Sequence, residues 1–269
     1  MTPEELQSKI YTYYDTFGRH DLPWRVERSP FTAFLSEVML QQTQVPRVCE
    51  KFHLFRNRFA SFAELAAAPQ GEIVTLWQGL GYNRRALFLH RAAQRITTTF
   101  GGALPTEDSD LRSLPGIGPA TAASLQVYAH NRPVAFIETN VRAVFIHHFF
   151  PGKTSISDET LHPLVADCLD KTNPYRWYSA LMDYGTMLKR TEKNPARNSA
   201  HHVRQSPFAG SRRAVRGAIL REISRAGEKG CSVETLTSLV EDPRRDAVLQ
   251  QLCDEGFISR KKNHYSLSD

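Results

Sequence analysis

Residues Leu111–His130 read LRSLPGIGPATAASLQVYAH, and this stretch decides the fold of the first domain. Prolines and glycines interrupt an otherwise helical pattern at Pro115, Gly116, Gly118 and Pro119. The pattern therefore predicts a helix, a tight turn and a second helix. Because Gly116 and Gly118 have no Cβ, the turn can expose backbone N–H groups at the start of the second helix. Such a helix start suits a phosphate group.

The hairpin alone does not establish a function, because a glycine-proline turn between two helices is usually only a corner in the fold. A carboxylate, Glu138, follows Gly118 by 20 residues, about the length of one helix and a connector. We therefore expect an acid beside a hairpin that holds a nucleic-acid backbone. Other parts of the chain have to support this hypothesis.

The composition is that of an ordinary globular protein with a basic balance. The chain has 269 residues, of which 41% are apolar and 23% charged, and its net charge is +6. This length allows one or two domains, and the charge favours an anionic partner. We see no signal peptide and no apolar run of the ~20 residues that a membrane span needs. We expect a cytoplasmic location and no membrane partner.

The cysteines do not suggest a disulfide framework or a thiolate metal cluster. They are scattered along the chain without a close pair, at Cys49, Cys168, Cys231 and Cys253. Cysteines with this spacing are typical of small buried apolar side chains.

The first domain, residues 1–190, is predicted to be all-α. Thr2, Pro3 and Glu5 form a helix start with a capping box. Sustained strand alternation is missing up to residue 190, and apolar residues recur at helical spacing. Further helices are expected within 31–59 (divided at Pro46), 62–68, 71–78, 83–99, 141–149, 157–170 and 174–189.

Two further segments follow this domain. Residues 191–210 are polar and basic, and we interpret them as a linker or surface strap. Residues 211–269 predict three helices and then a basic hairpin around residues 257–267, which is typical of a winged-helix-like domain. A dimerisation or docking module with a solvated basic tip remains the alternative.

Glu37 is the first candidate catalytic residue. It lies in a predicted helix among Phe34, Leu35, Val38 and Met39, so its carboxyl group should be partly desolvated. Burial raises the pKa of a carboxyl group, which suits a general acid that works near neutral pH. A salt-bridged structural role remains the alternative for this residue.

Glu138 supplies a second carboxylate, and two carboxyl groups in one pocket can cleave a glycosidic bond. Beside a phosphate-binding hairpin, that bond would belong to a nucleotide flipped out of DNA. The gap in the duplex must then be filled, and polar, apolar and aromatic side chains suited to this task are Gln41, Gln42, Leu80 and Tyr82. The alternatives are that Leu80 packs in the hydrophobic core and that the glutamines are ordinary polar residues on the surface.

Five segments together resemble the MutY-type adenine DNA glycosylases of the helix-hairpin-helix glycosylase superfamily, which also contains endonuclease III. They are LPWRVERSPFTAFLSEVMLQQTQV (22–45), LWQGLGYNRRALFLHRAA (76–93), LPGIGPATA (114–122), IETNVRAV (137–144) and ALMDYGTM (180–187). The match covers roughly residues 1–190. It implies a mainly α fold, with a six-helix barrel and a second helical lobe.

The resemblance also implies roles for individual residues. Adenine mispaired with 8-oxoguanine or guanine would be flipped into a pocket, where Glu37 matches the acid that protonates it. Glu138 stands where the family has an aspartate that stabilises the oxocarbenium ion. The pocket would be formed by Leu22, Trp24, Arg25, Asn140 and Asp183, and DNA would also contact Gly116, Gly118 and Thr121. The backbone carbonyls of Arg112, Leu114 and Ile117 match a site for Na⁺ or K⁺.

Several departures from the family pattern change the prediction. Glu138 is one methylene longer than the expected aspartate. Ala120 stands where endonuclease III has a Schiff-base lysine, so strand cleavage through that position is excluded. Non-cysteine residues occupy the four iron–sulfur positions, at Lys189, Ala196, Ser199 and Gln205. We therefore expect a monofunctional enzyme that has no iron–sulfur cluster and requires no cofactor.

The predicted partner is double-stranded DNA with a mispaired or damaged base, bound by a monomer associated with the nucleoid. The family's usual C-terminal domain, which inspects 8-oxoguanine, is replaced by the winged-helix-like domain. Three rivals stay open: a thymine or uracil mismatch glycosylase, an enzyme that processes abasic sites, and a non-catalytic protein that binds damaged DNA.

Overall fold

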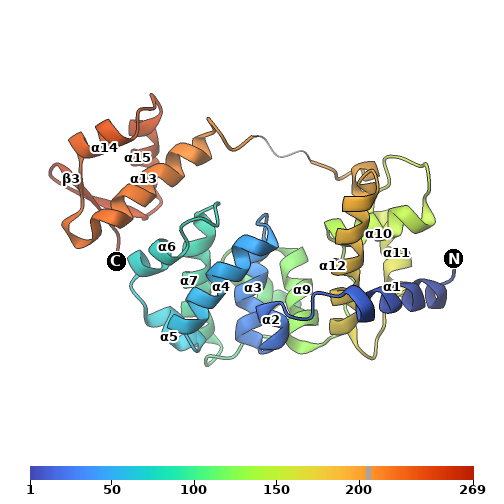
Figure 1. Cartoon of the computed structure of the whole chain (residues 1–269). Helices are drawn as coiled ribbons and strands as arrows, with labels where there is room; N and C mark the ends of the chain where they lie inside the picture. The colour runs from blue at the N-terminus through green and yellow to red at the C-terminus, as the bar shows by residue number, and fades with distance from the viewer. Residues whose placement is uncertain (204–206) are drawn as a thin grey trace. The chain divides into compact units, whose positions relative to one another are not determined.

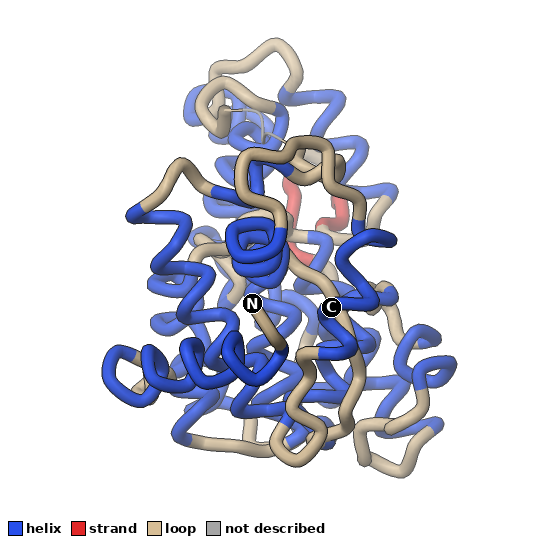
Figure 2. The backbone as a smooth tube through the Cα atoms, turned by 90° about the vertical axis from the view of Figure 1, so that its right-hand side faces the viewer, coloured by secondary structure: helices blue, strands red, loops and turns tan. Residues whose placement is uncertain are grey.

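A computed structural model describes residues 1–203 and 207–269. Gln205, one of the four positions compared above with cluster cysteines, lies outside the described residues. Helix predominates, and Figure 2 shows strands only in one small sheet of the described chain. Within the described ranges, no helix has the length and apolar character needed to cross a membrane.

The described chain divides into two compact units. The first is formed by residues 1–37, 105–113 and 117–203. Its helices, most of them labelled in Figure 1, are α1 (Pro3–Phe17), α2 (Pro23–Val26), most of α3 (Pro30–Leu40), α8 (Asp108–Ser113), α9 (Pro119–His130), α10 (Thr139–Phe149), α11 (Asp158–Asp167), α12 (Pro174–Thr191) and the 3₁₀ turn η1 (Pro195–Asn198).

The second unit is formed by residues 38–104, 114–116 and 207–269. Its first part contains α4 (Val45–Arg58), α5 (Phe62–Ala67), α6 (Gln70–Leu76) and α7 (Arg84–Thr99). Its C-terminal part contains α13 (Arg212–Ala226), η2 (Gly227–Lys229), β1 (Cys231–Ser232), α14 (Val233–Leu239), α15 (Arg245–Asp254), β2 (Ile258–Lys261) and β3 (His264–Leu267).

The core of the first unit is built on α1, α10 and α12. The predicted capping box opens α1: Glu5 N–H donates to the Thr2 hydroxyl, and the Glu5 carboxylate accepts from Thr2 N–H. One face of α1 then buries Leu6 and Ile10 against Trp177 of α12. Burial of each such side chain contributes about 1.5–3 kcal/mol, so packing rather than propensity holds these helices.

Helix α3 carries the first candidate acid and is buried on more than one face, as its apolar sequence predicts. Phe34 and Leu35 are 0% exposed. The buried hydroxyl of Ser36 donates to the Ala33 carbonyl at 3.0 Å, so the helix satisfies its own polar side chain. This helix therefore holds Glu37 in a rigid apolar setting.

The predicted helix-turn-helix at residues 111–130 is confirmed, with α8 ending at Ser113 and α9 beginning at Pro119. Gly116 has φ 80°, and a Cβ there would lie 2.8 Å from the Cβ of Phe88. Only glycine fits this position without a shift of its neighbour. Gly118 caps α9 with φ −89° and open space around it, so its backbone does not need glycine's conformational freedom.

The winged-helix-like arrangement is also confirmed. In the described chain α13, α14 and α15 accompany a three-stranded antiparallel sheet with the order β1-β3-β2. Tyr265 of β3 lies opposite Cys231 of β1 on one side and Arg260 of β2 on the other. The two-residue strand β1 was not predicted, because it is too short to show alternation.

Candidate active site

Glu37 is half-buried on α3. Burial raises the pKa of its carboxyl group from 4.5 to about 7. A hydrogen bond with the Ser124 side chain of α9 opposes the rise, and repulsion from Glu138 adds to it. The group is therefore close to half protonated at neutral pH, as a general acid requires.

Glu138 forms the N-cap of α10. Its Oε1 accepts from the backbone N–H of Asn140 at 2.5 Å and of Val141 at 3.1 Å. Its Oε2 lies 3.3 Å from the Asn140 side-chain nitrogen, which donates to it. The side chain thus caps its own helix, whose N-terminal dipole favours the negative charge.

Opposing influences act on the charge of Glu138. Burial dominates and raises the pKa of its carboxyl group above 4.5, while the Lys189 ammonium and the N–H groups of Val141 and Asn140 offset part of the rise. At Glu37 the Ser124 side chain has the corresponding role. Since repulsion disfavours ionisation of both groups together, and Glu138 has the larger set of partners that lower its pKa, the arrangement favours Glu37 as the group that carries the proton.

Asp183 joins two arginines of the first unit. Its side chain is 1% exposed, and that of Arg25 is 8% exposed. One carboxylate oxygen accepts from Arg25 at 2.7 Å and from the Arg19 backbone N–H at 2.7 Å. The other accepts from Arg25 at 3.1 Å and from the Arg19 guanidinium at 2.7 Å and 2.5 Å. In this arrangement Asp183 orients two guanidinium groups.

The neighbouring pocket candidates lie at the start of α2. Leu22 is 8% exposed and packs inward. Trp24 is half-buried on α2, directly before Arg25. Arg25 also lies over the Tyr14 ring, 5.6 Å from its centroid, and donates to the Ser179 carbonyl. The short helix therefore fixes Arg25 through charge, stacking and backbone contacts.

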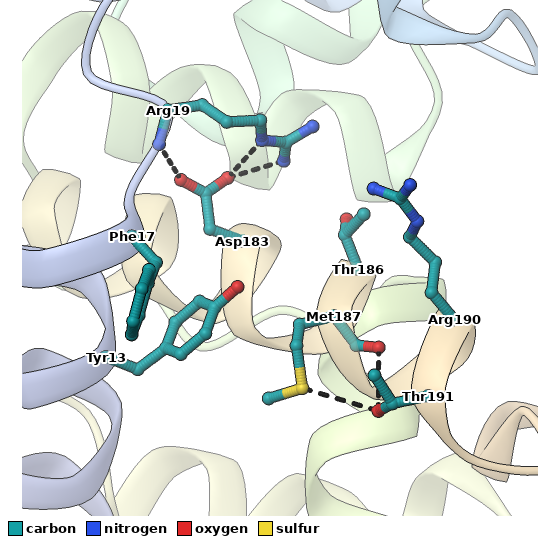
Figure 3. A pocket seen from close by; sticks show the side chains of 8 residues that line it. All are labelled: Tyr13, Phe17, Arg19, Asp183, Thr186, Met187, Arg190 and Thr191. Atoms are coloured by element: carbon teal, nitrogen blue, oxygen red, sulfur yellow. Dashed lines mark hydrogen bonds and ion pairs between the residues drawn. The ribbon is translucent and has the colours of Figure 1, made fainter.

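A cavity of about 380 Å³ lies between α1 and α12 (Figure 3). Its lining residues are Tyr13, Phe17, Arg19, Asp183, Thr186, Met187, Arg190 and Thr191. Thr186 donates to the Met182 carbonyl at 2.7 Å, and its hydroxyl oxygen lies 3.4 Å from Oδ1 of Asn140, the residue that donates to Glu138. Glu37 does not line it. Glu138 does not line it either, so the cavity adjoins Asp183 and not the two acids.

Two residues of α9 act on the paired acids and were missed by the sequence analysis. Ser124 reaches Glu37, and burial together with the charge of Glu37 raises the pKa of the Tyr128 hydroxyl. The Tyr128 ring meets those of Phe136 and Tyr175 edge to face, at 6.5 Å and 5.6 Å between centroids. The i, i+4 spacing of Ser124 and Tyr128 was the available signal, because it puts both on one helix face.

The candidate wedging residues lie in the second unit, on two loops that we call the wedge loops, 41–44 and 79–83. Gln41 donates to the Gly116 carbonyl at 3.3 Å, and Thr43 donates to the Leu80 carbonyl at 3.0 Å. Gln42 and Tyr82 have φ values of 55° and 45°. Such backbone is uncommon for non-glycine residues and often marks functional sites.

Leu80 has a different position from the other wedge candidates. Its side chain is 3% exposed, so core packing, the alternative left open above, describes it. A role for Leu80 in contacting DNA is therefore limited to its backbone.

Arg85 holds both wedge loops and was also missed. Its guanidinium donates to the carbonyls of Val38, Met39, Leu80 and Gly81 and to the Thr43 hydroxyl, at 2.8–3.1 Å. The residue is 7% exposed, and burial lowers the pKa of its guanidinium to about 10. The sequence gives no signal for a buried cation whose partners are mainly backbone carbonyls.

The remaining hairpin residues stay predictions. Thr121 is half-buried, and its carbonyl accepts from Ser124 at 2.9 Å. Arg112 and Ile117 fall in the first unit and Leu114 in the second. Their proposed role as carbonyl ligands of a monovalent cation remains an expectation from the resemblance.

The described positions compared with cluster cysteines carry no thiol group. In the described part of the chain they are Lys189, Ala196 and Ser199, and Ala196 is 3% exposed. Backbone hydrogen bonds instead hold the segment: Ile156 N–H donates to the Asn198 carbonyl at 3.0 Å, and Ala200 N–H donates to the Ile156 carbonyl at 2.9 Å. Apolar packing and a parallel bridge thus order the segment without thiolate ligands.

Comparison with known proteins gives a consistent set of relatives. Residues 35–165 match the HhH-GPD superfamily of base excision DNA repair proteins. An adenine DNA glycosylase of Mycolicibacterium smegmatis is 30% identical over 281 residues, covering 97% of this chain and 93% of that protein. One from Buchnera aphidicola subsp. Baizongia pistaciae is 30% identical over 192 residues, or 70% and 54% of the two chains. The chain thus spans about half the length of the Buchnera relative.

Among solved structures, that of a thermostable thymine-DNA glycosylase superposes with a TM-score of 0.60. It is 23% identical, and the match covers 69% of this chain and 86% of that one. At this identity the similarity shows the fold. The helical arrangement that carries the paired acids is therefore a known one.

Proposed function

The chain belongs to the HhH-GPD superfamily of base excision DNA repair proteins, in its adenine DNA glycosylase branch, and from this we propose that it is a monofunctional DNA glycosylase. It hydrolyses the N-glycosidic bond of an adenine that is mispaired with 8-oxoguanine or guanine. The observation that carries the proposal is the pair of carboxyl groups in one unit, with the pKa of Glu37 near 7.

In the proposed reaction Glu37 acts first as an acid. Its proton passes to N7 of the flipped adenine, which weakens the bond between C1′ and N9. The bond breaks with its electron pair on the base, and an oxocarbenium ion remains on the sugar. Glu37 is then a carboxylate and takes a proton from the water that attacks C1′, so that the acid is restored.

Glu138 stabilises the positive charge that develops at C1′. Its charge is fixed by the N–H groups of Asn140 and Val141, which do not have to reorganise during the reaction. The ion pair of Asp183 with Arg25 supports one wall of the base pocket, with Leu22 and Trp24 nearby. These residues orient the base, while the two acids act on the bond.

We propose double-stranded DNA as the partner, bound through the hairpin and the wedge loops. Gly116, Gly118 and Thr121 would contact the phosphate backbone, and Gln42 and Tyr82 would fill the gap left by the flipped base. Na⁺ or K⁺ at the hairpin carbonyls is compatible with this binding. We propose that the protein acts as a monomer in the cytoplasm, associated with the nucleoid, without an iron–sulfur cluster.

The direct test is base release from duplexes under single-turnover conditions. Wild-type protein should release adenine opposite 8-oxoguanine, leaving an abasic site that alkali cleaves, and Glu37→Gln should slow release by a factor of about 10² or more. Glu50→Gln, at an exposed position of α4, is the matched control. A Glu37→Gln variant as fast as wild type would contradict the proposal.

A panel of substrates separates the proposed specificity from its rivals. Adenine, thymine, uracil and hypoxanthine are offered opposite guanine and 8-oxoguanine. Faster release of thymine or uracil would indicate a pyrimidine mismatch glycosylase. Strand breaks at abasic sites without base release would indicate abasic-site processing, and tight binding without either product would indicate a damage sensor.

A further inference from the structure

The C-terminal residues 212–269 are packed onto the helices that flank a wedge loop. Val74 of α6 and Leu87 of α7 belong to the same hydrophobic cluster as Ile219 of α13. At Gly71 an added Cβ would lie 3.2 Å from the Cβ of Leu267, so β3 approaches α6 closely. This shared core fixes residues 212–269 relative to α6 and α7, which all belong to the second unit.

Polar contacts make the packing specific. The Glu255 carboxylate accepts from Arg84 of α7 at 2.5 Å and, through its other oxygen, from Arg216 of α13. The Gln70 side chain donates to the Gly256 carbonyl at 2.6 Å. Because these bonds need particular partners, they select one orientation of the C-terminal residues on α6 and α7.

This orientation brings Arg213 to Tyr82. The guanidinium donates to the Tyr82 hydroxyl at 2.6 Å, and its carbon lies 5.2 Å from the ring centroid. Arg85 lies 5.8 Å from the same centroid. The aromatic side chain, on backbone with φ 45°, therefore contacts two cations that come from different parts of the sequence.

The position of Arg213 does not stabilise the helix in which it lies. It lies in the first turn of α13 together with Arg212, and that turn has no acidic residue. The partial positive charge of a helix N-terminus disfavours arginine there. A residue that breaks a local rule while making a specific long-range contact is typical of a functional position.

We propose that Arg213 is a positioning residue for the duplex wedge: residues 212–269 hold the Tyr82 side chain in the conformation that enters the duplex. This rests on the proposed function, in which Tyr82 fills the gap beside a flipped base. A side chain that is ordered before DNA arrives does not lose that freedom on binding, so the wedge is preorganised. The C-terminal residues thereby act on duplex opening.

The test measures duplex opening directly, with 2-aminopurine placed next to the mispaired adenine. Its fluorescence rises when stacking is lost, whether or not a base is released. Arg213→Gln should raise the Kd for this duplex about tenfold, the lower end of the effect of one lost charge-assisted hydrogen bond, and should reduce the fluorescence rise at saturation. Arg212→Gln, which removes the same charge from an exposed neighbour, is the matched control.

A double-mutant cycle with Tyr82→Phe identifies the contact. This substitution removes only the hydroxyl that accepts from Arg213. In the Tyr82→Phe background, Arg213→Gln should raise the Kd by no more than about twofold, because the shared bond is already lost. Fully additive effects, or equal behaviour of the Arg213→Gln and Arg212→Gln variants, would overturn the proposal.

Two further outcomes are distinguishable. If the wild type unstacks the duplex but releases no base, the proposed function is wrong. The double-mutant cycle of Arg213→Gln and Tyr82→Phe then decides by itself whether Arg213 positions Tyr82. If thermal unfolding shows that Arg213→Gln does not fold, Tyr82→Phe becomes the deciding variant. It should then weaken the fluorescence rise, and an unchanged signal would refute the positioning role.

Discussion

Replacing Glu37 by glutamine should inactivate the protein and at the same time make it more stable at alkaline pH. The carboxyl group is half-buried among apolar neighbours, and burial raises its pKa from 4.5 to about 7. When a carboxyl group has a higher pKa in the folded chain than in the unfolded chain, its ionisation destabilises the folded chain relative to the unfolded chain. Glutamine has a similar shape and never ionises.

The size of the effect follows from the two pKa values. Each pH unit between them changes the free energy of unfolding by about 1.4 kcal/mol, so ionisation of Glu37 costs the folded chain up to about 3 kcal/mol. This cost is absent below the unfolded value of 4.5 and complete above about pH 7. Glu37→Gln should therefore match the wild type near pH 4.5 and exceed its stability by up to about 3 kcal/mol at pH 8.

The same pKa predicts the pH dependence of base release. With a pKa near 7, about nine-tenths of Glu37 is protonated at pH 6 and about one-tenth at pH 8. The single-turnover rate on the alkaline limb should therefore fall about tenfold between these two values. The fall should vanish in the slow residual reaction of Glu37→Gln.

Urea unfolding followed by tryptophan fluorescence measures the stability difference, since Trp77 and Trp177 are 1% and 0% exposed. Glu50→Gln, at an exposed position, should show no pH-dependent gain. If the advantage of Glu37→Gln is the same at pH 5 and pH 8, the carboxyl group is not desolvated in the folded chain. The acid role would then lose its physical basis.

Three further variants, two single and one double, test other parts of the protein. Ala120→Lys puts an exposed amine at the start of α9 and should add strand nicking with a borohydride-trapped adduct; an unchanged product would refute this geometry. Arg85→Lys cannot join both wedge loops and should lower the free energy of unfolding by about 2–4 kcal/mol, whereas a neutral effect in urea titrations would contradict its role. Neutralising Lys261 and Lys262, at the β2–β3 turn, should reduce the slope of log Kd against log salt concentration by about 0.9 for each lost phosphate contact. An unchanged slope would show that this turn does not contact the DNA phosphates.

Local signals were enough to predict most of the fold. Proline and glycine punctuation predicted the helix-turn-helix around Gly116, and the apolar run around Phe34 predicted a buried α3. Both depend on neighbours within a few residues, which the sequence displays directly. Strand β1 depends on pairing between Cys231 and Tyr265, 34 residues apart, and such pairing has no local pattern.

The site was predictable in its residue types and unpredictable in its partners. Burial of Glu37 followed from its apolar neighbours. Three hydrogen bonds of Arg85 join it to residues 42 to 47 positions away in the sequence, and the bond between Arg213 and Tyr82 spans 131 positions. Only the folded chain brings these partners together. The role of Asp183 was equally unpredictable, because it depends on Arg19 and Arg25, which lie 164 and 158 positions away in the sequence.

Glu138 and Lys189, which both differ from the family pattern, interact electrostatically. The Glu138 carboxylate caps α10 through Oε1, and its Oε2 accepts from the Asn140 side chain. Burial works against its charge, and the Lys189 ammonium, at a position compared with a cluster cysteine, works in its favour. The N-terminus of α10 and the Lys189 ammonium thus offset part of the effect of burial on Glu138, whereas at Glu37 the Ser124 side chain opposes burial and the pKa still rises to about 7.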